Sequence, residues 1–286
     1  MQMFMQRRGL ATFAVKSLLE KQLAEFPTKS ALRVTHQNIR WTYANLHDHS
    51  VALASGLVDV GLGPGSCVGA VLGNNAENVS VMLGAANAGM KVASASSSDK
   101  LTKESLGRIL SNNKCSVLFI SPDKISVVYE LLPELKGMRL DQSVELKLEA
   151  YPELKYICHT GISAVAGMHR FRDILLYNAI PNRLENIAEK DDAPFFVQID
   201  GASGSTKSEM TQKEAIAAAE KKAGELKLDG KSRVLFKVKK DYPTNLVLGT
   251  LACASSNAQL VVPSDVFDES ACEKAILEDS CNATLK

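Results

Sequence analysis

Short apolar runs alternate with stretches of helical periodicity along most of this chain. The first helix is expected to begin after Thr42, a good N-cap, and to end at Gly61. A buried strand is expected over residues 67–72, and Asn74 or Asn75 then caps a second helix. This β-α-β-α order predicts a doubly wound α/β fold, in which a largely parallel sheet carries helices on both faces.

The later parts of the chain continue the same alternation. A strand at residues 90–93, a polar serine-rich loop at 95–100 and a helix at 102–112 are expected in that order. Residues 133–153 are charged and weakly patterned, which indicates a connecting excursion. The remaining expected elements are strands at 116–120, 195–199, 233–238, 259–262 and 283–285, and helices at 211–227, 246–254 and 269–278.

Residues 191–207 run from an apolar strand into a loop of glycine, serine and threonine with one lysine. Small residues allow backbone N–H groups to face a polyphosphate, and a lysine offsets its charge. We expect Thr211 to open a helix shortly after this loop. The candidate cofactor-binding residues are therefore Gly201, Ser203, Gly204 and Lys207.

The overall composition limits the classes of function. A hydrophobic content of 45% and a charged content of 23% are ordinary for a globular protein, and 286 residues suffice for one large or two modest domains. The net charge of +1 argues against nucleic acid as the main partner. No apolar run is long enough to predict a transmembrane span. The six cysteines form no C-x-x-C pair, so we expect reduced, mostly buried thiols and no metal site.

The N-terminal segment differs from the rest in charge. Residues 1–19 contain Arg7, Arg8 and Lys16, several large apolar side chains and no acidic residue. A basic, acid-free, amphipathic segment is typical of a mitochondrial targeting sequence, although an ordinary first helix with a basic face is the alternative. Residues 20–286 then form an incomplete α/β domain, with a possible subdomain break near residues 180–192.

Several motifs, in this order and at these spacings, resemble the N-terminal domain of the adenylate-forming (AMP-binding) acyl-CoA synthetases. Residues 191–207 fall where that family carries its ATP loop. The match runs from about Trp41 to the last residue, and residues 133–171 match poorly. The other matching segments are residues 41–46, 54–57, 61–65, 68–72, 84–89, 101–110, 114–119 and 245–262.

The resemblance implies an N-terminal domain that binds ATP with magnesium and a carboxylic acid, makes an acyl-adenylate and passes the acyl group to coenzyme A. In such a reaction the loop holds the β- and γ-phosphates, and the leaving pyrophosphate needs N–H donors and positive charge.

The chain departs from the family pattern in its loop. Where the family has Ser-Gly-Thr-Thr-Gly-Lys-Pro-Lys-Gly, this chain has residues 200–208, in which the first two glycines and the second lysine, Lys207, are retained and Ser208 replaces the last glycine. Asp200 replaces the first serine and Ser205 replaces the first lysine. A carboxylate at the mouth of a phosphate site repels the ligand. We therefore expect nucleotide binding to be lost unless Asp200 points away from the site or helps to hold a metal ion.

Two further departures point the same way. Residues 239–242, Lys-Lys-Asp-Tyr, stand where the family usually has Pro-Leu-Tyr-His, and the two lysines are expected to be exposed. The adenine-binding strand, the Tyr-Gly-x-Thr-Glu and Thr-Gly-Asp motifs and the catalytic lysine have no copy in this sequence, so we expect an incomplete active site with no catalytic residues.

Other interpretations fit less well. Residues 201–208 lack the last glycine of a Walker A loop, and residues 201–205 are not a G-x-S-x-G nucleophile elbow. His47 and His49 are two positions apart on a helix, so they are expected to be solvated rather than to chelate a metal.

The sequence therefore predicts a non-catalytic accessory subunit of a mitochondrial protein assembly, in the matrix or on the matrix face of the inner membrane, with no cofactor. The alternative is a nucleotide- or acyl-CoA-binding protein, or a ligase half, that binds ATP or AMP with magnesium and acts with another chain.

Overall fold

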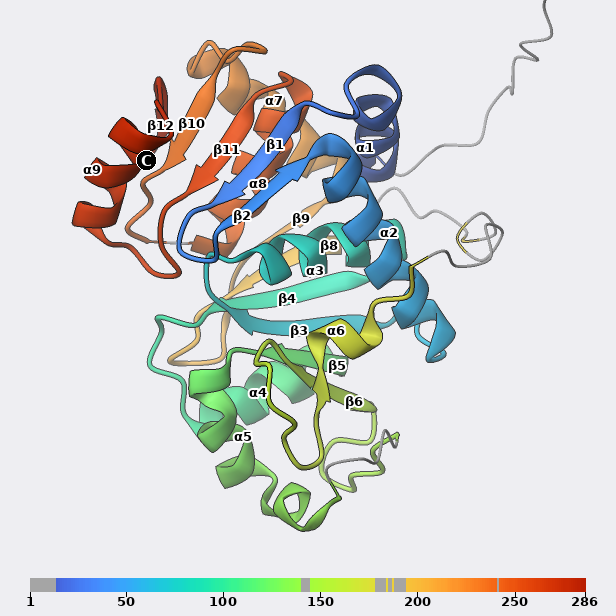
Figure 1. Ribbon diagram of the computed structural model, residues 1–286. Helices are drawn as coiled ribbons and strands as arrows, with labels where there is room; N and C mark the ends of the chain where they lie inside the picture. Colours follow the sequence, from blue (N-terminus) through green and yellow to red (C-terminus); the bar gives the residue numbers. More distant parts are fainter. Residues whose placement is uncertain (1–13, 140–144, 178–183, 185–186, 188–193, 241) are drawn as a thin grey trace, which may run out of the picture.

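Two sheets with a layer of helices between them make up the fold (Figure 1). The structure is a computed structural model and describes residues 14–139, 145–177, 184, 187, 194–240 and 242–286. The seven-stranded sheet contains, in spatial order, β7 (His169–Arg170), β6 (Tyr156–His159), β5 (Cys115–Ile120), β3 (Cys67–Leu72), β4 (Lys91–Ser96), β8 (Pro194–Ile199) and β9 (Thr206–Thr211). The five-stranded sheet contains β12 (Ala283–Leu285), β10 (Arg233–Phe236), β11 (Gln259–Val262), β1 (Ser30–Val34) and β2 (Ile39–Thr42).

The pairing within both sheets is largely parallel. Among the named strands, only β1–β2 and β8–β9 pair antiparallel. β3 lies between β4 and β5, and successive connections cross to opposite faces of the sheet, as in doubly wound folds. The expected fold class is confirmed, although the strands are divided between two sheets.

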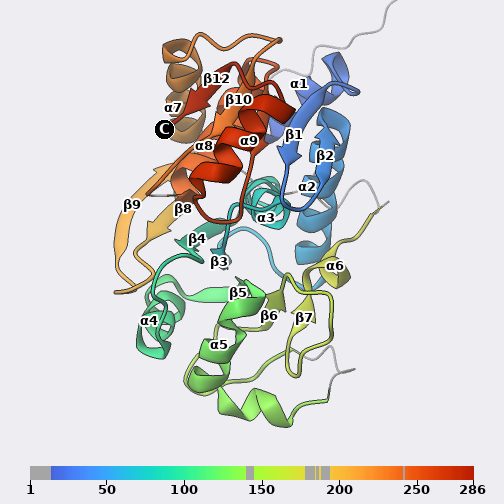
Figure 2. The ribbon, with the colours of Figure 1, turned by 60° about the vertical axis from the view of Figure 1, so that its left-hand side comes forward.

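The helices form three layers around these sheets, which are visible from two sides in Figures 1 and 2. The layer between the sheets contains α2 (Tyr43–Asp59), α3 (Ala76–Asn87), α7 (Gln212–Glu225) and α8 (Tyr242–Ser255), and α1 (Ala14–Glu25) packs against these four. The outer face of the seven-stranded sheet carries α4 (Lys103–Asn113) and α5 (Ile125–Leu131). The outer face of the five-stranded sheet carries α9 (Glu269–Glu278). The short α6 (Phe171–Ile174) contacts α2.

Short polar side chains start the helices where the sequence predicts. Thr42, Asn75 and Thr211 each accept a hydrogen bond from the backbone N–H three residues later, at the start of α2, α3 and α7. Such a cap contributes about 1 kcal/mol to helix stability. Glu214 completes a capping box with Thr211.

The largest apolar core fills the space between the two sheets. Val15 and Leu19 on α1 belong to it, with 0% and 1% of their surface exposed. The helix that they anchor therefore belongs to the folded protein from its first turn. Residues 1–13 lie outside the described residues, so targeting by residues 1–19 stays a prediction.

Three smaller points concern the expected boundaries. β4 continues through Ser96, so the serine-rich loop is shorter than expected. A six-residue strand, β9, separates the glycine-rich loop from the helix that Thr211 opens. The possible break near residues 180–192 falls almost entirely outside the described residues.

Candidate functional site

The glycine-rich loop is the turn of a β-hairpin. It connects β8 to β9, and the Asp200 N–H donates to the Ser205 carbonyl oxygen at 2.9 Å. The Gly204 N–H donates to the Asp200 carbonyl oxygen at 2.7 Å, with Gly204 in the left-handed region at a φ of 73°. The loop therefore does not lead directly into a helix, and the N-terminus of α7 lies at the far end of β9. Thr211 opens the helix as expected, and the unexpected strand β9 separates it from the loop because residues 206–211 pair with β8.

The Asp200 carboxylate is bound by its own loop. Its Oδ1 accepts hydrogen bonds from the N–H groups of Ala202 and Ser203, both at 3.0 Å. Its Oδ2 lies 3.3 Å from Nζ of Lys207. The hydrogen bond from Ser203 and the ion pair with Lys207 lower the pKa of Asp200. A carboxylate thus holds the N–H groups and the lysine that a phosphate would need.

A second carboxylate serves the same loop. The N–H of Gly201 donates to Oδ2 of Asp99 at 2.9 Å. A Cβ at position 201 would stand 2.6 Å from Cβ of Asp99, so only glycine permits this approach. The Ser205 N–H donates to Ser203 Oγ at 3.2 Å. Together with the bonds above, every N–H from residue 200 to 205 has an acceptor within the protein.

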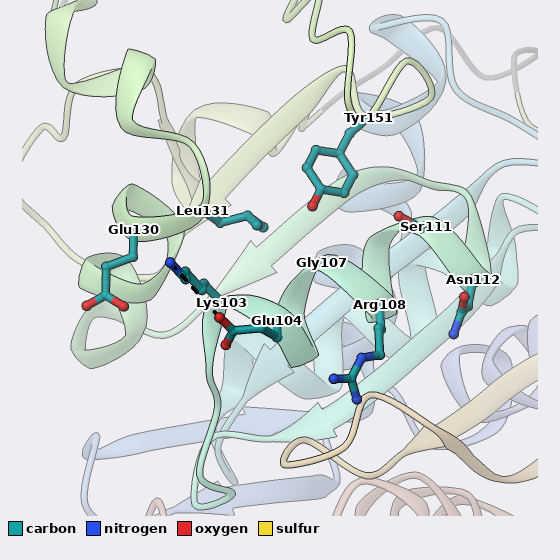
Figure 3. Close-up of a pocket in the computed structure, with 9 residues that line it drawn as sticks. All are labelled: Lys103, Glu104, Gly107, Arg108, Ser111, Asn112, Glu130, Leu131 and Tyr151. Atoms are coloured by element: carbon teal, nitrogen blue, oxygen red, sulfur yellow. Dashed lines mark ion pairs between the residues drawn. The ribbon is translucent and has the colours of Figure 1, made fainter.

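The loop is also fastened to α4. Nη1 of Arg108 donates to the Ser203 carbonyl oxygen at 2.7 Å. Figure 3 shows the Arg108 guanidinium extending toward the neighbouring loop. A Cβ on Gly204 would stand 2.6 Å from the carbonyl oxygen of Ser105, so the loop backbone packs directly on this helix. The four predicted site residues are therefore close together, and their backbone is held in place by Arg108.

A small polar cavity of ≈ 180 Å³ adjoins the loop at the carboxyl ends of β4 and β8. Ligands of doubly wound folds bind at this end of the strands. Lys207 lies in the cavity wall with Lys239 and Lys240, both exposed as expected, and among the described lining residues Asp99 carries the one carboxylate. The rest of the lining is Ser96, Ser98, Gln198, Ile199 and Pro243. The charge of this cavity favours an anion.

A larger groove of ≈ 470 Å³ lies between α4, α5 and the segment around Tyr151 (Figure 3). Gly107 forms its floor, and a Cβ there would stand 2.7 Å from the Tyr151 hydroxyl. The walls carry both signs of charge, with Lys103 and Arg108 opposed by Glu104 and Glu130. The sequence gives no signal for this groove, because its walls come from segments far apart in the chain.

His49 is half-buried rather than solvated, which corrects the expectation for this residue. Its ring stacks on Trp41 with ring centres 4.1 Å apart, and its Nδ1 is hydrogen-bonded to the Tyr177 hydroxyl at 2.6 Å. Burial lowers the pKa of His49. His47 is also only partly exposed, beside Asp48. Neither histidine adjoins the glycine-rich loop in the structure.

Two negative findings apply to the described ranges only. Within them, no group of three or more histidine, cysteine, aspartate or glutamate side chains is placed to hold a metal ion. Of the helices that the structure describes, none combines the length and apolar character needed to cross a membrane.

Comparisons with known proteins agree with this fold. The sequence profile of the family described as "AMP-binding enzyme" matches residues 19–196. YngI of Bacillus subtilis, which carries the name of an acyl-CoA synthetase, is 28% identical over 278 residues, covering 92% of this chain and 49% of its own length. The mitochondrial medium-chain acyl-CoA ligase ACSF2 of Macaca fascicularis is 25% identical over 278 residues, covering 92% and 44% of the two chains.

Solved structures show the same architecture. The apo structure of MbtA from Mycobacterium smegmatis superposes with a TM-score of 0.74 at 19% identity, covering 94% of this chain and 47% of that one. The chain spans about half the length of the curated relatives it matches. Since the family profile matches more than half of the residues, the chain belongs to the AMP-binding enzyme family.

Proposed function

We propose that this protein is a non-catalytic member of the AMP-binding family that acts as an accessory subunit of a mitochondrial protein assembly. One observation carries the non-catalytic part. The Asp200 carboxylate accepts the N–H groups of Ala202 and Ser203 and pairs with Lys207, in the loop that resembles the family's ATP loop.

A phosphate that enters this loop has to displace the Asp200 carboxylate, which is already bound by two N–H groups and Lys207. If the carboxylate stays within ~5 Å of the incoming phosphate, each pair of unit charges costs about 3 kcal/mol at an effective dielectric constant near 20. If it moves away, two charge-assisted hydrogen bonds and an ion pair are lost from the folded loop. Both routes oppose the binding of ATP or AMP with magnesium.

Exposed apolar side chains support a role in an assembly. Val266 precedes α9 with 43% of its surface exposed, and Leu277 on α9 is 81% exposed. Ile276, next to Leu277 on α9, is 40% exposed, and a contiguous exposed apolar patch favours burial against a protein partner. The basic, acid-free residues 1–19 and the similarity to a relative named as mitochondrial support the location.

Titration of the purified full chain with ATP and magnesium tests the non-catalytic part. We expect no saturable binding to the wild-type protein and measurable binding to D200S, in which the loop regains a hydroxyl. D123S is the matched control, because Asp123 is an exposed carboxylate that, like Asp200, pairs with a lysine, here its neighbour Lys124. Saturable binding to the wild-type protein that K207A abolishes would contradict the proposal.

Affinity purification from gently solubilised mitochondria tests the accessory part. We expect the tagged protein to elute in one large complex with stoichiometric partners, and L277D to elute free. I162D is a matched control, because Ile162 is another exposed apolar residue, at 79%, next to the seven-stranded sheet rather than on α9. A wild-type protein that elutes as a monomer or dimer would contradict this part.

A second candidate function rests on the cavity beside Lys207. Its three lysines support binding of a nucleotide or acyl-CoA phosphate by a protein that acts with another chain. Under this function, the double variant K239A/K240A loses phosphate-ligand binding while D200S does not gain it. The two outcomes separate this candidate from the first.

A further inference from the structure

Three residues with complementary chemistry start three neighbouring strands. Cys67, the first residue of β3, is the register partner of Lys91 on β4 and of Cys115 on β5. Adjacent strands lie about 4.8 Å apart. A disulfide needs Cα atoms roughly 4.4–6.8 Å apart, so the backbone spacing of Cys67 and Cys115 suits a direct bond between them.

The sulfur of Cys115 leans over β3, next to Gly69. Gly69 makes the space for it, because a Cβ at position 69 would stand 3.1 Å from Cys115 Sγ. A bulge in the β3–β5 pairing directly after Cys67 shifts the register at this point. Both thiols belong to the apolar core on the outer face of this sheet, where Cys67 Sγ donates to the Val68 carbonyl oxygen at 3.8 Å and Cys115 Sγ donates to the Ile109 carbonyl oxygen at 3.6 Å.

The surroundings give the two thiols different roles. The neighbouring Cys115 thiol lowers the pKa of Cys67 despite its burial, and the charge of Lys91 lowers it further. The same pairing and burial raise the pKa of Cys115. Cys67, the register partner of Lys91, is therefore the thiol that ionises first.

A cleft of ≈ 230 Å³ reaches the Cys115 side of this pair, whose residues are 2% (Cys67) and 1% (Cys115) exposed. Cys115 lies in its wall, between Leu110 on α4 and Leu154 before β6. Its other lining residues are Ser111, Lys114, Ala150, Tyr151, Pro152 and Glu153. A small oxidant such as hydrogen peroxide can approach the sulfurs from this side when the cleft opens by local motion.

We propose that Cys67 and Cys115 form a redox-active dithiol that closes an intrachain disulfide on reaction with a peroxide. The Cys67 thiolate attacks one peroxide oxygen, which forms an S–O bond, breaks the O–O bond and releases the other oxygen as water after protonation. Cys115 then attacks the Cys67 sulfur, which forms the S–S bond and breaks the S–O bond. That oxygen leaves as a second water and takes the Cys115 proton. Two thiols are oxidised and one peroxide is reduced.

The position of the Cys67–Cys115 disulfide determines which strands it would join. β3 and β5 are central strands of the seven-stranded sheet, and the dithiol lies at the ends of the strands opposite the Asp200 loop. The bond ties two central strands together without touching the loop. This inference is independent of the proposed function.

Peptide mapping of the full chain tests the proposal. The protein is treated with hydrogen peroxide, free thiols are blocked with N-ethylmaleimide in denaturant, and non-reduced digests are analysed by mass spectrometry. We expect a linked Cys67–Cys115 peptide that a reductant removes. The controls C158S and C253S, which alter isolated buried thiols, should keep the link, whereas C67S and C115S lose it. In C115S, Cys67 should remain trapped as a sulfenic acid that dimedone labels.

The role of Lys91 supplies a second readout. Replacing it in K91M should slow the oxidation several-fold because the neighbouring cation is lost, and K91R should restore the rate. The proposal is overturned if both thiols of the peroxide-treated wild-type protein are recovered as maleimide adducts. It is also overturned if linked peptides join Cys115 to other cysteines as often as to Cys67. Both results come from the wild-type chain, so the test does not depend on the folding of a variant.

Discussion

Arg33 on β1 and Asp279, the residue that ends α9, form an ion pair that is almost entirely removed from solvent. Arg33 Nε lies 3.5 Å from Asp279 Oδ1, and the two side chains are 8% and 7% exposed. Thr35 donates its hydroxyl to the second carboxylate oxygen at 3.3 Å. The pair joins β1, a strand of the five-stranded sheet, to α9, the helix on the outer face of that sheet.

Removing Asp279 should be costly, because the Arg33 charge then stays buried beside neutral acceptors, Asn38 Oδ1 and the Ile39 carbonyl oxygen. We expect D279A to lower the free energy of unfolding by about 3 kcal/mol or more, as measured by urea denaturation. R40A is the control, since Arg40 contacts the same carboxylate at 3.7 Å with 67% of its side chain exposed, and should cost less than about 1 kcal/mol. The double variant R33M/D279L should be more stable than D279A. Equal losses in R40A and D279A would refute this account.

Gly56 permits the close packing of α2 against the C-terminal end of α6. A Cβ at this position would stand 1.6 Å from the carbonyl oxygen of Ile174, a backbone atom that cannot rotate away. We expect G56A to destabilise the protein by about 3 kcal/mol or more in thermal unfolding. G63A should change little, because a Cβ on Gly63 meets nothing within 4 Å. A mild effect of G56A would show that α6 moves freely over α2.

Stability should decrease as the pH falls below neutrality. Burial lowers the pKa of four histidines from the ordinary 6.5: His36, His49, His159 and His169. Their folded-state pKa lies below the unfolded value, so the unfolded chain binds more protons as the pH falls through 6.5. The stability that each neutral histidine contributes above this pH is lost below it. The loss is about 1.4 kcal/mol for each pKa unit by which folding lowers the pKa of the histidine. Urea unfolding at about pH 7.5 and 5.5 measures the loss. H49Q should reduce the difference, and an unchanged difference would contradict the assignment to His49.

Arg108 should control the motion of the glycine-rich loop. Its hydrogen bond to the Ser203 carbonyl oxygen is exposed, so R108A should change the free energy of unfolding by less than about 1 kcal/mol. Hydrogen exchange of the amides of residues 201–205 should nevertheless become several-fold faster, because these amides exchange by local opening. R172A, a substitution of an exposed arginine on α6, should leave their exchange unchanged. Equal exchange in R108A and the wild-type protein would mean that Asp99 and Asp200 hold the loop unaided.

Local features of the fold could be predicted from the sequence, and features that join distant segments could not. The caps at Thr42, Asn75 and Thr211 act on residues three positions away, and the strand Pro194–Ile199 carries its own apolar pattern. β9 was not expected, because its first four residues are all exposed and give no apolar alternation. Its strand character comes from pairing with β8.

The candidate site shows the same limit. The loop residues and the disruptive Asp200 could be identified from their positions, yet the Asp99 carboxylate and the Arg108 guanidinium that complete the loop come from a segment about 100 residues earlier. His49 and Tyr177 likewise meet only through the packing of α2 beside α6. No periodicity encodes such pairs, because each depends on which helix covers which sheet.

The five-stranded sheet combines two strands from the start of the chain with three from its last third, and this order has a consequence for biosynthesis. β1 and β2 leave the ribosome early, but β1 pairs with β11, whose Leu260 is the partner of Leu32. Until most of the chain has been translated, the apolar side chains of this hairpin have no sheet to join. We therefore expect the nascent chain to depend on chaperones that shield the hairpin, whereas the β3–β4–β5 unit can fold as soon as its own residues emerge.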